Sequence, residues 1–223
     1  MNLELSFVLS GDLSEYKYTQ KTILDLVSLM PESLNLIPKP LEVPVLSEKG
    51  FDLESRVNLS NKELNINFLP DKIEVTKFIS NTQFNFKTEE KKFCETIELL
   101  YLNISKIDYF KHLKFERIGI LSSISSDNKV KLEECVKEFR IEKDEKIEWL
   151  EKSLDRLYID DLNEKINIIK SSSKQENQQG KPIEDVYPII YKFSKDINTV
   201  PYISDERIDF NFLQNFIKAL GDK

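Results

Sequence analysis

The segment "ELNINFL", residues 63–69, is the clearest indication of the fold class. Its apolar residues Leu64, Ile66 and Phe68 alternate with Asn65 and Asn67. This period of two is typical of a strand with one face on a core and the other in solvent, as in an antiparallel sheet. The turn-forming segments "SNK" before it and "PD" after it separate it from similar stretches. We therefore predict three consecutive antiparallel strands, over residues 51–59, 63–69 and 72–79.

The rest of the chain divides into further strand-like and helix-like patterns. The alternation in "LELSFVL" predicts a first strand over residues 3–9. Other strands are predicted over residues 114–124, 164–170 and 186–197. Helical spacing predicts helices over residues 14–30, 89–111, 128–140, 145–158 and 205–221. Four prolines in residues 31–46 exclude a helix or a central strand there, so this segment is predicted to be an extended surface connection.

Capping residues and apolar stripes support these helices. Thr88 and Asp127 are the predicted caps of the second and third helices, and Asp205 or Asp209 lies near the start of the last. The second helix carries an amphipathic stripe, which we expect to face the sheet, at Phe93, Ile97, Leu100 and Ile104.

The predicted elements follow the order β-α-βββ-α-β-αα-ββ-α. Short connections between neighbouring strands favour mostly antiparallel pairing with helices packed against the sheet. The sequence therefore predicts a single α+β domain over residues 1–223. It shows no convincing internal repeat.

One polar stretch stands apart, "KSSSKQENQQGKP" at residues 170–182. It lacks large apolar side chains and lies between two β-rich segments, which predicts a polar mobile loop at about 171–182 joining paired strands. A domain linker is disfavoured, because too little chain follows it to build a second core. A binding arm that folds on a partner stays open as an alternative.

Composition limits the possible partners and the compartment. The formal net charge is −7 and the charges are interleaved, so the broad positive footprint of a DNA binder is missing. A local patch of Tyr16, Lys17, Tyr18 and Lys21 is the best candidate for a nucleic-acid contact, although a polar helix face explains it as well. The N-terminal residues do not resemble a signal peptide, and no stretch approaches the length of a membrane span. We expect a cytoplasmic protein.

Few residues are candidates for catalysis. The single histidine, His112, excludes sites that need two or more histidines. Cys94 and Cys135 form no CxxC pair and are expected to be buried, reduced thiols. No glycine-rich phosphate loop or nucleophile elbow is present. We predict no cofactor.

Scattered carboxylates are the remaining candidates for catalytic or metal-binding residues. Asp71 is expected in a turn, while the odd spacing of Glu74 and Lys77 sends them to opposite faces of a strand. A second group lies at turns or near the start of the last helix, where solvation and capping account for acids: Asp160, Asp161, Asp196, Asp205, Glu206 and Asp209. We therefore predict no catalytic and no metal-binding residues.

Several short patterns resemble a bacterial family. They are the late strand "KDINTV", the helix "FNFLQNFIKAL", the hairpin "NINFLPDKIEVTKF" and the strand "FERIGI". Their order is similar to that of a sporadically distributed bacterial protein family of unknown function. The resemblance covers most of the chain in outline and implies no catalytic residues.

The leading hypothesis is a non-catalytic protein–protein interaction factor, such as an antitoxin, an immunity protein or a subunit of a phage-defence complex. The missing catalytic constellation and a negative charge suited to a basic protein partner support it. The alternative is a metal-dependent nuclease or hydrolase that uses scattered carboxylates, of which the best candidates are Asp71, Glu74, Asp196 and Asp209.

Overall fold

The computed structural model describes residues 1–223 except 48–49, 81–83, 142–147, 178–186, 200–207 and 222–223. The strands of the described chain are β1 (Asn2–Ser10), β2 (Ile37–Ser47), β3 (Gly50–Ser60), β4 (Leu64–Leu69), β5 (Lys72–Ser80), β6 (Arg117–Ser126), β7 (Trp149–Ile159), β8 (Glu164–Glu176) and β9 (Ile189–Thr199). The α-helices are α1 (Gln20–Leu29), α2 (Phe86–Ile104), α3 (Lys129–Cys135) and α4 (Phe210–Gly221). Two short 3-10 turns are η1 (Glu32–Leu34) and η2 (Asp160–Leu162).

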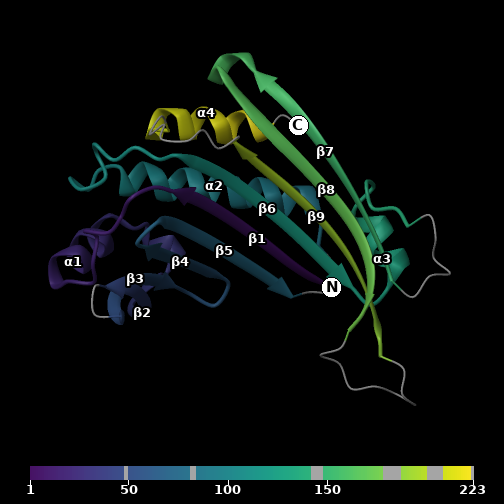
Figure 1. The fold of residues 1–223 in the computed structure, drawn as a ribbon, viewed down its shortest axis with the longest axis horizontal. Helices are drawn as coiled ribbons and strands as arrows, with labels where there is room; N and C mark the ends of the chain where they lie inside the picture. The colour runs from purple at the N-terminus through teal and green to yellow at the C-terminus, as the bar shows by residue number, and fades with distance from the viewer. Residues whose placement is uncertain (48–49, 81–83, 142–147, 178–186, 200–207, 222–223) are drawn as a thin grey trace.

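The nine strands form one sheet in the order β2-β3-β4-β5-β1-β6-β9-β8-β7. Every neighbouring pair is antiparallel. The predicted α+β class and antiparallel pairing are therefore confirmed, with β1 and β6 at the centre (Figure 1).

The topology repeats once, which the sequence did not reveal. One half runs β1, α1, β2 to β5 and α2, and the other runs β6, α3, β7 to β9 and α4. In each half the last strand of the meander pairs with the first strand of that half, β5 with β1 and β9 with β6. The two halves meet at the β1–β6 pair, so they share one continuous sheet.

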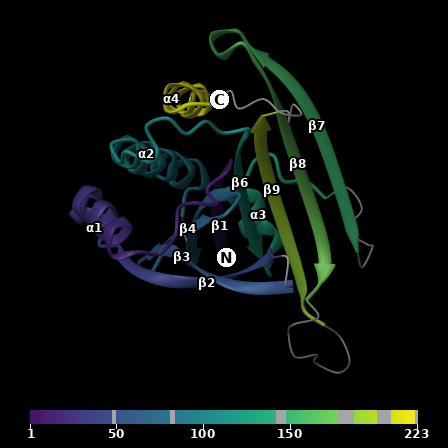
Figure 2. The same cartoon turned by 60° about the vertical axis from the view of Figure 1, so that its left-hand side comes forward.

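The helices lie on one face of the sheet, which we call the covered face. Figure 2 shows α1, α2 and α4 on the same side of the strands. The predicted stripe of α2 is confirmed, because its members are at most 1% exposed: Phe93, Ile97, Leu100 and Ile104. They pack in a cluster that includes the inward residues of β1, namely Leu3, Leu5, Phe7 and Leu9.

Ion pairs fix the first turn of α2 over the sheet. Lys77 of β5 lies 3.3 Å from the Glu89 carboxylate, and Lys195 of β9 lies 3.9 Å from that of Glu90. Lys92 donates a second hydrogen bond to Glu89, at 2.8 Å. The hydrogen bond from Lys92 is the main cause of a lowered pKa of Glu89, and the hydrogen bond from Lys77 lowers this pKa further. The α2 helix is thus tied to both halves of the sheet.

Helix caps differ in part from the predictions. Asn85, not Thr88, caps α2, since its Oδ1 accepts a hydrogen bond from the Thr88 N–H at 3.0 Å. Asn128, not Asp127, caps α3 in the same way. Asp209 lies at the start of α4 as predicted, and its Oδ1 accepts from the Phe212 N–H at 2.8 Å. A side chain caps most effectively when its residue is the last non-helical one, which sequence places only within a few residues.

The first predicted helix, residues 14–30, is shorter than expected. It begins at Gln20, after the Thr19 cap. Before it, the Leu13 and Tyr18 N–H groups donate to the Pro70 and Ser55 carbonyls, at 2.7 and 3.0 Å. The backbone of this connection is thus engaged with the sheet, apart from one turn in which the Tyr16 N–H donates to the Leu13 carbonyl at 2.9 Å.

Two predicted segments change type. Residues 145–158 were predicted as a helix, but residues 149–158 lie in strand β7, which pairs with β8 along its whole length. Its Leu150 and Leu154 are exposed on the strand. Residues 31–46, predicted as a connection, contain the edge strand β2, where prolines are tolerated because one side of the strand needs no hydrogen bonds.

The polar stretch also extends a strand. β8 continues to Glu176, so residues 171–176 of the predicted loop are strand, and the Asn177 N–H donates to the Pro188 carbonyl at 2.7 Å. The remainder of the predicted loop, from residue 178, lies outside the described residues. The observed order is thus β-α-ββββ-α-β-α-βββ-α and not the predicted one. The single-domain assignment stays a prediction.

Candidate functional site

The second face of the sheet carries no described helix, and we call it the open face (Figure 2). In an antiparallel pair, residues directly opposite each other project from the same face. The strand registers therefore give the composition of this face row by row. One row across six strands consists of Phe78, Glu4, Ser123, Ser194, Ser171 and Lys152. The next consists of Ser80, Asn2, Ser125, Lys192, Ser173 and Leu150.

Short hydroxyl side chains occupy the middle of the open face. The serine floor, as we call it, comprises Ser123 and Ser125 on β6, Ser194 on β9, and Ser171 and Ser173 on β8. The hydroxyl oxygens of Ser171 and Ser194 lie 2.7 Å apart and share a hydrogen bond. Ser171 and Ser173 come from the stretch that was predicted to be a loop.

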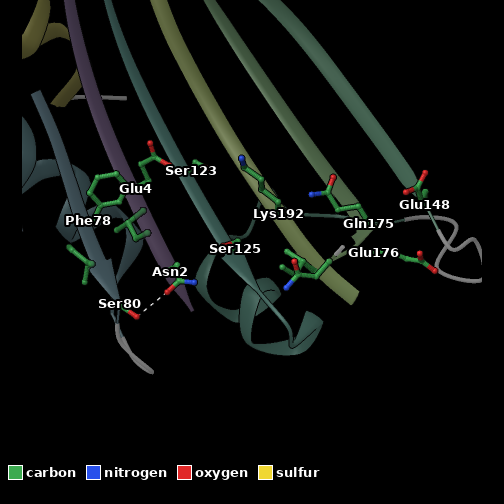
Figure 3. A pocket seen from close by; sticks show the side chains of 14 residues that line it. Asn2, Glu4, Phe78, Ser80, Ser123, Ser125, Glu148, Gln175, Glu176 and Lys192 are labelled. Carbon is green, nitrogen blue, oxygen red and sulfur yellow. Dashed lines mark hydrogen bonds between the residues drawn. The ribbon is translucent and has the colours of Figure 1, made fainter. Parts of the chain in front are cut away.

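A hollow of about 750 Å³ lies over the ends of the central strands (Figure 3). Ser123 and Ser125 line it, because their short side chains leave space between longer neighbours. Glu4 and Lys192 project into it from β1 and β9. The other lining residues are Asn2, Leu3, Phe78, Ile79, Ser80, Glu148, Gln175, Glu176, Asn177 and Ile190. The lining thus combines amides, hydroxyls, charges of both signs and a few apolar groups.

Large apolar side chains are also exposed on the open face. Phe78 and Leu121 are 55% and 37% exposed, and Leu150, Leu154 and Tyr158 on β7 are 70%, 57% and 52% exposed. We call these five residues the exposed apolar set. Leu121 lies in one cross-strand row with Leu154, through Asp196 and Ile169. The five residues lie on β5, β6 and β7, and large apolar side chains exposed on one face of a sheet are available for burial against a partner.

The first group of candidate carboxylates is dispersed. Asp71 is exposed in the turn between β4 and β5. Glu74 lies on the open face, where its carboxylate is 3.6 Å from the Lys72 ammonium, whereas Lys77 reaches Glu89 on the covered face. The prediction that Glu74 and Lys77 lie on opposite faces is confirmed.

The second group is also accounted for by local contacts. Asp196 accepts a hydrogen bond from the Asn198 amide at 2.9 Å, and Asp209 caps α4. Asp160 and Asp161 lie in η2, and Asp160 is exposed, while residues 205–206 lie outside the described chain. Among the described residues, no three His, Cys, Asp or Glu side chains are grouped so that they could hold a metal ion.

The single histidine and the two cysteines occupy separate places. His112 is exposed, after α2. Cys94 and Cys135 are free thiols, half-buried and not fully buried as predicted. Burial raises the pKa of Cys94 to about 11 and also raises that of Cys135. Thiols with raised pKa values are poor nucleophiles at neutral pH.

The suggested nucleic-acid patch is not assembled. Tyr16 is buried and packs on Phe68 and Phe110, with ring centroids 5.4 and 4.7 Å away. Lys17 forms an ion pair with Glu54 at 3.1 Å. Tyr16 therefore offers no exposed ring on which a base could stack.

Comparison of the chain with known protein families, with characterised proteins and with solved structures finds no match. The resemblance to a sporadically distributed bacterial family stays a prediction. None of the described helices is long and apolar enough to cross a membrane.

Sequence reasoning missed most residues of this face. Leu150, Lys152 and Leu154 were assigned to a helix, and Ser171 and Ser173 to a loop. Apolar residues four apart fit one face of a strand as well as one face of a helix, so their spacing alone does not separate the two. A run of serines gives no periodicity at all.

Proposed function

We propose that this protein is a non-catalytic protein-interaction factor that binds a partner protein on the open face of its sheet. One observation carries the proposal, the exposed apolar set on a sheet face that no described helix covers. Burying these side chains against a partner would remove apolar surface from water, which is the main driving force of association.

The rest of the open face fits the same role. Interfaces between proteins combine apolar side chains with hydroxyl and amide groups that form hydrogen bonds and hold water. The serine floor and the mixed charges of the hollow supply such groups. The net charge of −7 would speed encounter with a basic partner. An antitoxin, an immunity protein or a subunit of a defence complex would each use such a surface.

The proposal is tested by co-purification with a tagged full-length chain from its source cells. The variant Phe78→Ser/Leu121→Ser changes the open face, and Leu24→Ser/Val130→Ser is the control, because Leu24 and Val130 are exposed on α1 and α3. We expect one protein that the wild type and the control retain and that the open-face variant loses about 10-fold or more. Equal retention by both variants would contradict the proposal, provided that thermal melting shows all proteins folded.

The nuclease alternative has its own test. Nuclease and phosphodiesterase activity is assayed with Mg²⁺ and with Mn²⁺, on the wild type and on Asp71→Asn, Glu74→Gln, Asp196→Asn and Asp209→Asn. We expect no turnover and almost no rise in melting temperature with either metal, because the acids lie apart. Activity that one of these substitutions abolishes in a folded protein would overturn the non-catalytic assignment.

A further inference from the structure

Strand β7 forms one edge of the sheet, and among the described strands it pairs only with β8. It is 11 residues long and contains no proline. Residues 150–158 are exposed, whichever face they project from. No described residue pairs with the outer edge of β7, so this edge presents backbone N–H and C=O groups that another strand can pair with.

The opposite edge is closed to such pairing. Strand β2 carries Pro38, Pro40 and Pro44, none of which has a backbone N–H to donate. A continuous ladder can therefore form on the β7 edge and not on the β2 edge.

The side chains of β7 are sorted by charge between its two faces. Lys152 and Arg156 project on the open face, together with the apolar residues Leu150, Leu154 and Tyr158. Glu151 and Asp155 project on the other face, because they are offset by one residue. A strand added at this edge would therefore meet bases on one face and acids on the other.

This sorting disfavours a second copy of the chain as the occupant. Two β7 strands related by a two-fold axis would run antiparallel, and the open faces of both copies would form one surface. Depending on the register, either the bases of one copy would face the bases of the other, or Glu151 and Asp155 would face their own counterparts. Like charges opposite each other across strands are destabilising.

We infer that β7 receives a strand from a partner protein, with acidic residues facing Lys152 and Arg156, basic residues facing Glu151 and Asp155, and apolar residues against Leu150, Leu154 and Tyr158. The added strand would extend the open face next to the serine floor. The inference rests on the proposed function, since it names where and by which chemistry the partner docks. Backbone pairing would supply affinity, and alternate side chains would supply specificity.

Two synthetic peptides of equal composition test this chemistry. The first is Val-Thr-Glu-Lys-Val-Thr-Glu-Lys-Val, which places acids on one face and bases on the other. In the second, each Glu and its neighbouring Lys are exchanged. Titration of the full-length protein is followed by the amide NMR signals of β7. We expect the first peptide to shift these signals and to bind about 5-fold more tightly than the second, since oppositely charged cross-strand pairs are favourable.

Charge reversal sharpens the test. In Lys152→Glu/Arg156→Glu the preference between the peptides should decrease or reverse. In the control Lys87→Glu/Lys91→Glu, which changes two exposed lysines of α2 by the same charge, the preference should be unchanged. Three results would each overturn the inference. They are signal shifts away from β7, equal affinities for both peptides, and a wild-type dimer that Lys152→Glu/Arg156→Glu, the β7 variant, abolishes.

The co-purified partner separates this inference from the proposed function. If the partner is lost with Phe78→Ser/Leu121→Ser but retained by Lys152→Glu/Arg156→Glu, the open face is the site and strand addition at β7 is overturned. If the β7 variant also loses the partner and the lysine control retains it, the inference is supported. If no partner is retained by any protein while the first peptide binds β7 selectively, the strand site stands and the proposed function fails.

Discussion

The two edge strands of the sheet both have backbone groups that could pair with another strand, and they limit such pairing in different ways. Each is 11 residues long and each leaves one side of its backbone without a neighbouring strand among the described residues. In β2, prolines remove donors from the backbone. In β7, no donor is removed, and only the charges of the side chains select what can pair.

The two edges are also anchored differently. Next to β2, the buried guanidinium of Arg56 donates to the Leu13, Ser14 and Tyr16 carbonyls, at 2.9 to 3.0 Å, and contacts the Glu54 carboxylate. Next to β7, the exposed Arg156 donates to the Asn167 side chain at 3.0 Å. Arg56 of β3 therefore ties the β2 side of the sheet to the rest of the fold, whereas β7 contributes little buried surface and is available for a partner.

The largest expected effect contrasts the core with the β7 edge. Leu100→Ala in α2 should lower the free energy of unfolding by about 2–5 kcal/mol, because the side chain is fully buried and its loss leaves a cavity. Leu154→Ala on β7 should change it by about 0.5 kcal/mol or less, because that side chain is 57% exposed. Urea denaturation measures both. A large loss for Leu154→Ala would show that β7 is part of the core.

The next effect compares the two anchors. Arg56→Ala should cost about 2–4 kcal/mol, because it leaves buried carbonyls without donors. Arg156→Ala should cost about 0.5 kcal/mol or less, as its guanidinium is exposed. Similar values in denaturation experiments would break the contrast between the edges. Arg56→Lys serves as a second variant, which keeps the charge but cannot reproduce all three hydrogen bonds.

Removing the prolines should open the closed edge. Pro38→Thr/Pro40→Thr/Pro44→Thr should lower stability by about 1–3 kcal/mol, mainly because the unfolded chain gains freedom. The same variant should self-associate at high concentration, since β2 then presents a continuous row of donors. Light scattering after size exclusion measures the mass. A strictly monomeric triple variant would show that something other than the prolines protects this edge.

The smallest effect concerns pH at the β2 side. The hydrogen bond from Lys17 and the nearby Arg56 lower the pKa of Glu54 below its ordinary value of 4.5. Its carboxylate therefore stabilises the fold above about pH 4.5, and this contribution is lost as the pH falls through the lowered pKa. The melting temperature of the wild type should fall more steeply below pH 4.5 than that of Glu54→Gln. Parallel curves for the two proteins would exclude this contribution.

Local patterns with a single periodicity were predicted well. The alternation in residues 63–69 and the stripe of α2 each fit only one type of element, and both were placed correctly. The same holds for the opposite faces of Glu74 and Lys77, which follow from strand geometry alone. Long-range pairing was not predictable in this way, so the open face and its exposed apolar set were missed.

The α+β class, an antiparallel meander, an amphipathic helix and the lack of a familiar catalytic motif follow from the sequence alone, because these features depend on residues close together in the chain. Long-range pairing, in contrast, makes residues 149–159 a strand and extends β8 through the serines to Glu176. In isolation these segments have weak or ambiguous periodicity. Pairing along the full length of β8 satisfies their backbone N–H and C=O groups and so overrides local preference.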